Sequence, residues 1–316
     1  MITIGFSPHR AEIIPFACQM MEQHQIIVLE EPSHPKFADM LNGDLSIDDY
    51  LMEIDIGFPE FERLMCKEAR RHHQKGKKLL QVEPYLERLL EIHEYFAQGR
   101  TPAEVLNIAH LKAVYLAEKS ATGALIKYYA RSIEKDFNQV IESVKAFANA
   151  DAQRLKLQSI MRAKAIAILD TTKNIFVETG YIHYPLYRYL LQDFKGNKNI
   201  RAVYLMQPVF KKLKCKRRNM GPGDILTLYY ALNLPIKEDV ADLLAARSLI
   251  YTQLIQTEEM LPDHSNPTPH SLDEALVNRL VDRLGFEDCR TIYSEIRFKN
   301  RNESLDFVKS HVRTKC

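Results

Sequence analysis

Imidazole, carboxylate and hydroxyl side chains follow four apolar runs of the sequence, each at the point where the run ends. They are Ser7 and His9 in "GFSPHR", Glu30, Glu31 and His34 in "LEEPSH", Glu83 in "VEPY", and Glu178 and His183 in "ETGYIH". One such residue alone is more often a helix cap or a satisfied polar group than a ligand. Four ends together present the mixed nitrogen and oxygen donors that Zn²⁺ or Mn²⁺ accepts, so the repetition indicates a site.

The elements that must position these residues are five short strands. The apolar runs are rich in Ile, Val and Leu without clean polar alternation, and they span residues 2–6, 25–30, 77–83, 174–179 and 200–206. Helical patterns lie between them, at about 10–23, 58–74, 84–97, 102–170 and 184–193. This alternation predicts an α/β fold with a mainly parallel central sheet flanked by helices. Ligands bind beyond the carboxyl ends of such strands, so we expect the residues above to converge there.

The spacing of the strands predicts the domain organisation. About ninety residues separate the third and fourth runs, too many for one crossover helix, so residues 84–170 are expected to form a long helical insertion. Thr101 and Glu104 have the spacing of a capping box at the start of a helix in this insertion. We therefore predict an α/β core over residues 1–210, followed by a basic connector and a helical C-terminal region over 211–316.

Composition limits the classes of partner. Forty-three basic and 41 acidic residues leave a formal charge of +2, which creates no long-range field toward nucleic acid. The run "KKLKCKRR" at 211–218 has no interleaved aromatic residues, so a solvated connector is favoured over a nucleic-acid surface. No stretch of 18 apolar residues predicts a membrane span, and the first residues lack the pattern of a signal peptide. A cytoplasmic protein without membrane contact is expected.

The motif "GYIH", Gly180 to His183, carries a resemblance to a known superfamily. The chain resembles the group of Tiki proteins, TraB-domain proteins, ChaN-like haem-binding proteins and erythromycin esterases. Its members share a Gly-x-x-His near the N-terminus, an acidic residue at the next strand end, an arginine on a helix and a second Gly-x-x-His. "GYIH" fits the second motif, Arg162 the helix arginine, and Glu30 or Glu31 the acidic residue. The resemblance spans about residues 1–210.

Two features of these motifs bear on geometry. The first motif departs from the pattern, because three residues rather than two separate Gly5 from His9. At the second motif, Gly180 is expected to let the backbone turn off the strand and to leave room for a ligand. Pro185 is expected to begin the next helix.

The residues and the resemblance together indicate a metal-dependent hydrolase that cuts an amide or ester bond of a small-molecule or peptide substrate. His9, Glu30 and His183 would hold the Zn²⁺ or Mn²⁺ ion. Glu83 would act as general base and Arg162 would stabilise developing negative charge, with Glu31 as a further catalytic carboxylate. A metal-free variant would use His9 directly as the base.

A non-catalytic ligand-binding protein of the same superfamily is the alternative. The ChaN-like members imply haem as its cofactor, with histidines and tyrosines near residues 181–189 as ligands or stacking partners. The sequence names no substrate and leaves the identity and presence of a metal open. The apolar pattern of residues 242–261 suits a core or a homo-oligomer contact equally.

Overall fold

The computed structural model describes residues 1–54, 57–194, 200–215 and 220–314. The chain divides into two compact units, each assembled from segments that are distant in sequence. Unit 1 contains Met1–Tyr115, Lys156–Pro208 and Glu259–Pro269, and unit 2 contains Leu116–Leu155, Val209–Glu258 and His270–Cys316. In each unit, the chain therefore leaves the unit and returns to it twice.

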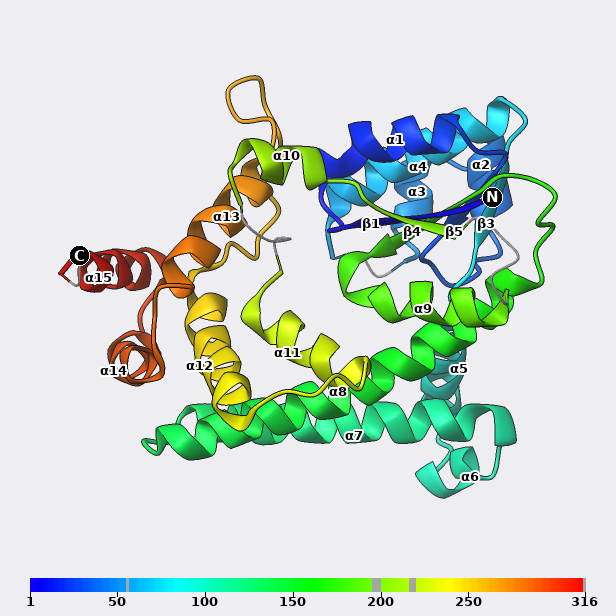
Figure 1. Ribbon diagram of the computed structural model, residues 1–316. Helices are drawn as coiled ribbons and strands as arrows, with labels where there is room; N and C mark the ends of the chain where they lie inside the picture. The colour runs from blue at the N-terminus through cyan, green and yellow to red at the C-terminus, as the bar shows by residue number, and fades with distance from the viewer. Residues whose placement is uncertain (55–56, 195–199, 216–219, 315–316) are drawn as a thin grey trace. The chain divides into compact units, whose positions relative to one another are not determined.

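Unit 1 is built on a five-stranded sheet in which the strands pair in the order β3-β2-β4-β1-β5 (Figure 1). The strands are β1 (Ile2–Ser7), β2 (Ile26–Leu29), β3 (Lys78–Gln81), β4 (Ile175–Gly180) and β5 (Ile200–Tyr204). Every pair is parallel. The predicted α/β fold with a parallel central sheet is confirmed.

Helices cover both faces of this sheet. The helices of unit 1 include α1 (Ile14–Glu22), α2 (Phe37–Asn42), α3 (Ile47–Leu51), α4 (Pro59–Gln74), α5 (Pro84–Ala97) and α9 (Tyr184–Asp193), with short 3-10 turns at Ala11–Ile13 and Tyr181–His183. On one face, Ile4, Val28 and Val177 pack against Leu186 of α9 and Ile166 of α8 (Phe137–Ala167). Figure 1 shows α1 and α4 along the other face.

The register of the sheet sets the candidate site. Ser7 at the end of β1 pairs with Gly180 at the end of β4, so His9 and His183 leave neighbouring strands at the same level. The helices that follow these two strands, α1 and α9, lie on opposite faces of the sheet (Figure 1). Chains that diverge in this way leave a crevice at the carboxyl edge, the usual ligand position in open α/β sheets.

The helical tract predicted at 102–170 is three helices, α6 (Pro102–Leu106), α7 (Ala109–Ser132) and α8. The capping box at Thr101 and Glu104 is present, although the helix that it opens has only five residues. The middle of the predicted insertion, residues 116–155, belongs to unit 2 rather than to the α/β core. Unit 2 begins again at Val209, close to the predicted boundary after residue 210.

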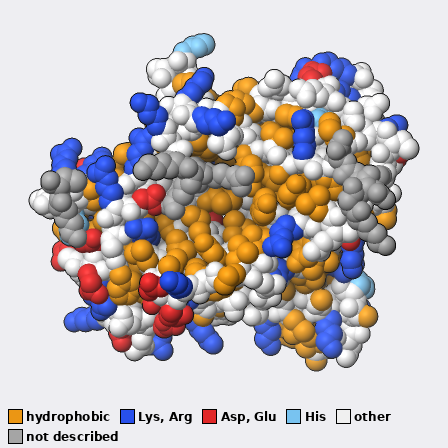
Figure 2. Space-filling model, in the orientation of Figure 1, with side chains coloured by type: hydrophobic (Ala, Val, Ile, Leu, Met, Phe, Trp, Pro, Cys, Tyr) orange, Lys and Arg blue, Asp and Glu red, His pale blue; other side chains and the backbone are white. Residues whose placement is uncertain are grey.

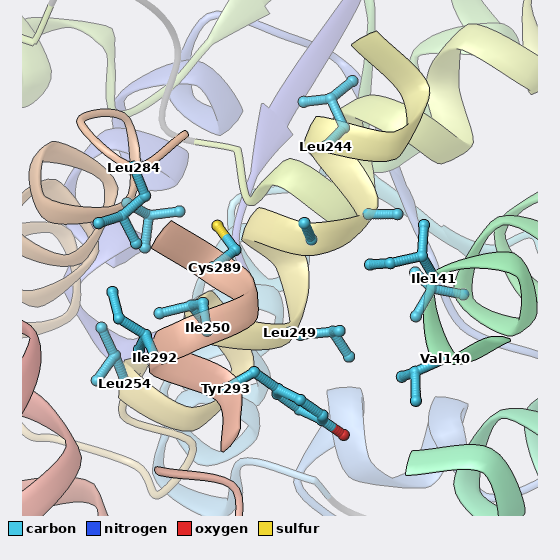
Figure 3. Close-up of a cluster of buried hydrophobic side chains, with 14 of the residues drawn as sticks. Val140, Ile141, Leu244, Leu249, Ile250, Leu254, Leu284, Cys289, Ile292 and Tyr293 are labelled. Carbon is cyan, nitrogen blue, oxygen red and sulfur yellow. The ribbon is translucent and has the colours of Figure 1, made fainter. Parts of the chain in front are cut away.

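Unit 2 has a hydrophobic core of its own. Its C-terminal helices are α11 (Pro222–Ala231), α12 (Glu238–Leu254), α13 (Pro269–Val281), α14 (Phe286–Ile296) and α15 (Arg301–Thr314), preceded by α10 (Gln207–Lys212). Figure 3 shows Ile250 of α12 and Ile292 of α14 in this core, together with Val140 and Ile141 of α8. Much of the apolar pattern at 242–261 thus serves core packing within unit 2.

The surface bears on the predicted partners. On the face seen in Figure 2, Lys and Arg side chains are dispersed rather than gathered into one patch. Within the described ranges, no helix combines the length and the apolar character that crossing a membrane requires. Of the basic run at 211–218, residues 216–218 lie outside the described residues.

Candidate active site

His9 lies at the centre of a cluster of carboxylates. Its Nε2 atom is 3.0 Å from Glu178 Oε1, a hydrogen bond, and 3.6 Å from Glu30 Oε2. The Phe61 ring of α4 stacks on the imidazole, with centroids 5.3 Å apart and an interplanar angle of 7°. Burial lowers the pKa of His9, but the Glu178 and Glu30 carboxylates outweigh it and raise the pKa to about 9.

Glu30 is held by three donors from two segments, α8 and the end of β4. Arg162 Nη1 donates to its Oε1 at 2.6 Å, the Thr179 hydroxyl donates to the same oxygen at 2.7 Å, and the Gly180 N–H donates to Oε2 at 2.7 Å. Burial raises the pKa of Glu30, but the charges of His183, Arg162 and His9 lower it to about 2. Glu30 is therefore a fixed, ionised carboxylate.

Arg162 lies below the site rather than in it. Its side chain is 1% exposed, and besides Glu30 it donates to the Val82 carbonyl, the Thr179 hydroxyl and the Glu178 carbonyl. These acceptors engage all three guanidinium nitrogens, which leaves none directed at a substrate. This position suits a residue that orients Glu30. It does not suit the predicted role, in which Arg162 contacts the negative charge that develops on the substrate.

Glu83 lies next to Arg162 and is fully buried. Its Oε2 is 3.6 Å from Arg162 Nε, and its side chain has no exposed surface. Burial raises the pKa of Glu83 to about 7, against the opposing charge of Arg162. A carboxyl group in this position supports Arg162, and it lacks the access to water that the predicted general base needs.

His183 approaches the cluster from the 3-10 turn that follows β4. Its Nε2 is 3.7 Å from Glu30 Oε1, and its side chain is 16% exposed. Burial, with help from Arg162, lowers the pKa of His183 against the opposing charge of Glu30. The predicted turn at Gly180 was wrong, because its backbone is ordinary extended chain, with φ −61° and ψ 145°. A Cβ atom there would lie 3.4 Å from His183 Cδ2 and 3.5 Å from Glu30 Oε2, so the room predicted for a ligand stays a prediction. The helix after the motif does begin with Pro185 in its first turn.

Glu178 completes the group, although we predicted no role for it beyond its place at a strand end. One ligand atom each from His9, Glu30 and Glu178 lie within 4.8 Å of one another. Two of the predicted ligands follow β2 and β4. Glu30, after β2, belongs to this group, and His183, after β4, lies beside it. The predicted residues His9, Glu30 and His183 are thus brought together.

Two further carboxyl groups border the cluster. Glu31 accepts a hydrogen bond of 2.7 Å from Gln81 Nε2, and burial together with Glu178 raises its pKa. Glu62, in the first turns of α4, has its pKa raised to about 8 by burial and by Glu31. Both are half-buried, which makes them better placed than Glu83 for exchange of protons with water.

Sequence reasoning missed Glu62 because it lies inside a helix pattern, where acidic residues are common on solvated faces. Glu178 carried a usable signal. It is a charged residue within an otherwise apolar strand, and a buried charge in such a position requires a partner.

Comparison with known proteins finds a similar protein over almost the whole chain. An uncharacterised protein from Archaeoglobus fulgidus is 29% identical to this chain over 290 residues. The similarity covers 92% of this chain and 97% of the relative, so it includes parts of both units. No protein-family model and no solved structure matches the chain.

Proposed function

We propose that the chain is a metal-dependent hydrolase that acts on an amide or ester bond of a small-molecule or peptide substrate. The observation that carries the proposal is the convergence of His9, Glu30 and Glu178. Ligands about 2.1 Å from a tetrahedral ion lie about 3.4 Å apart. The spacings of 3.0 Å and 3.6 Å from His9 Nε2 to the two carboxylates bracket this value, so the donors fit a divalent ion.

The charge balance of the site favours a divalent cation once the His9 imidazole is neutral, because metal binding releases the proton that Glu178 and Glu30 hold on it. Glu30 and Glu178 meet at His9 with Arg162 directed at Glu30, while Glu31 and Glu62 add carboxyl groups nearby. A site with several carboxylates and one guanidinium attracts a divalent cation and orients it through fixed oxygens. When bound, Zn²⁺ or Mn²⁺ supplies Lewis acidity toward a water molecule and the scissile carbonyl.

The residues of the chain have distinct roles in this proposal. Arg162, Thr179 and the Gly180 N–H hold Glu30 in one orientation, and Phe61 fixes the plane of the His9 ring. Glu62 or Glu31 accepts a proton from water and returns it to the leaving group. Arg162 and Glu83 act behind the ligands as positioning residues.

Two alternatives remain distinct in chemistry. A metal-free hydrolase would use the His9 and Glu178 pair, whose 3.0 Å hydrogen bond is the geometry of a base with its orienting carboxylate. A haem-binding protein would need an imidazole nitrogen free to ligate iron. Nε2 of His9 and of His183 both face carboxylates here, so haem gains no support from this geometry.

The test is to strip the purified protein with chelator and add back Mn²⁺ or Zn²⁺ while measuring thermal unfolding and hydrolysis of chromogenic esters and amides. At an ion concentration one hundred times Kd, binding should stabilise the native state by about 2.7 kcal/mol. Hydrolysis should return with the ion. Hydrolysis that persists in chelator would favour the metal-free alternative, and a Soret absorption band in the purified protein would favour haem.

A further inference from the structure

The first turn of α4 has a cap that comes from a distant part of the chain. The residue at the N-cap position, Phe58, has no side-chain acceptor, so the first amides of the helix need another partner. The Glu259 carboxylate supplies it: Oε2 accepts from the Glu60 N–H at 3.0 Å and Oε1 from the Phe61 N–H at 2.9 Å. The negative charge of Glu259 also interacts favourably with the positive end of the helix dipole.

This same helix turn supports the segment that carries His9. Phe61 is 3% exposed and stacks on the His9 imidazole. The Arg10 guanidinium lies over the Phe58 ring, 3.6 Å from its centroid. His9 and Arg10, which follow β1, therefore rest on the rings of Phe61 and Phe58. Both rings belong to the helix turn whose amides Glu259 holds.

We propose that Glu259 is a positioning residue of the active site, which fixes His9 through Phe61 and the first turn of α4. The inference rests on the proposed function for its catalytic meaning. It assigns a role to the segment Glu259–Pro269, which belongs to unit 1 although the chain on both sides of it belongs to unit 2. The helical C-terminal region thus contributes a residue on which the site depends.

The experiment follows His9 itself in the metal-free protein. The ¹H–¹³C signal of the His9 imidazole feels the ring current of Phe61, so Phe61→Leu gives the reference shift for a lost stack. Glu259→Ala should move the signal in the same direction, and Glu259→Gln, which keeps one acceptor oxygen, should move it less. Glu258→Ala is the matched control, because Glu258 is the exposed acidic neighbour, and it should leave the signal in place.

The second readout is the affinity for Mn²⁺ by calorimetry. Loss of a residue that orients a metal ligand typically weakens the affinity for the metal by about tenfold or more. Glu259→Ala should therefore raise the Mn²⁺ Kd by about tenfold. Combining Glu259→Ala with Phe61→Leu should add little beyond the larger single effect. An unmoved His9 signal in both Glu259 variants, with Phe61→Leu shifted, would overturn the positioning role. A wild-type protein that binds no Mn²⁺ while its His9 signal still depends on Glu259 would overturn the metal proposal alone.

Discussion

Acidic side chains converge at two places in the molecule, and the two clusters differ in what neutralises them. At the sheet edge of unit 1, Glu30 and Glu178 meet at His9, and both carboxylates are almost fully buried. In unit 2, Glu142, Glu238 and Asp242 converge with comparable closeness. Proximity of carboxylates is therefore common to both clusters and does not by itself define a metal site.

The unit 2 cluster already has its cation. Lys145 Nζ lies 2.8 Å from Glu142 and 2.7 Å from Asp242 and also bonds Glu238. Glu142 and Glu238 are 68% and 79% exposed, so water solvates their remaining oxygens. The sheet-edge cluster instead has an imidazole at its centre, a guanidinium beneath it and little solvent. Burial and fixed orientation, rather than the number of acids, distinguish the candidate site.

The largest expected effect comes from removing the buried cation. Arg162→Met leaves Glu30 charged and without its main partner, and breaking such a buried pair costs about 3–5 kcal/mol. Lys145→Met, the matched change in unit 2, leaves carboxylates that water reaches and should cost about 1 kcal/mol or less. Urea unfolding of both variants measures the difference.

A double variant controls this comparison. Arg162→Met combined with Glu30→Gln leaves no uncompensated charge, so it should recover part of the stability lost in Arg162→Met. Equal losses in the Arg162 and Lys145 variants would mean that the two clusters do not differ in burial energetics.

The pH dependence of stability is the next effect in size. With its pKa at about 9 in the native state and about 6.5 unfolded, His9 stabilises the fold fully below about pH 6.5. That contribution is lost as pH rises through 9. Partial exposure of the ring screens its charge, so we expect a loss of about 1–2 kcal/mol, which His9→Gln should remove.

Glu62 acts in the same direction at lower pH. Its raised pKa of about 8 favours the protonated native state, so stability falls as pH rises from about 4.5 to 8. Glu62→Gln should flatten that part of the profile. A metal-free protein whose stability rises between pH 7 and 9 would contradict both assignments.

His183→Ala should have a smaller effect, confined to the ligand. His183 lies beside Glu30 but outside the group of three, so its loss should weaken Mn²⁺ by about tenfold, or about 1.4 kcal/mol. The fold should be little changed, since a strand-end imidazole buries little apolar area. Calorimetry and thermal unfolding of the same samples separate the two effects, and a variant that fails to fold would point to a structural role for His183.

The basic run should have the smallest effect. Lys211, Lys212 and Lys214 lie in or just after α10, at the start of the second unit 2 segment, and Lys216 lies outside the described residues. Replacing all four with Ala should leave Mn²⁺ affinity and hydrolysis within about twofold of wild type, because no charge of the candidate site changes. A large loss would show that the run reaches the site.

The sequence predicts the strands and their ends because apolar runs mark buried parallel strands and polar residues mark where burial stops. His9, Glu30 and His183 are found together for that reason. The strand order, which places β4 between β1 and β2, has no local signal, and Glu178 gains its meaning only from that order. Glu62 lies in helix α4, and Glu259 lies 199 residues beyond Glu60, whose amide it caps. No periodicity in the sequence relates either residue to His9.

The same limit applies to the division into units. The apolar stripes of α7 and α8 predict helices, but they do not tell which core the stripes face. Residues 116–155 pack in unit 2 because Val140, Ile141 and Val144 meet α12 and α14 side chains there. An apolar helix face does not predict which core it packs in. A charged residue at a strand end does predict its position, at the edge of the sheet.

Titration of Mn²⁺ into the metal-free protein is the most direct test of the central claim, that the sheet-edge cluster and not the unit 2 cluster holds a metal. Calorimetry should find one tight site in the wild type. Glu178→Gln, which keeps the shape and removes the charge, should weaken that site by at least about tenfold, and Asp242→Asn should leave it unchanged. Binding lost in Asp242→Asn but retained in Glu178→Gln, or no binding in the wild type, would contradict the account.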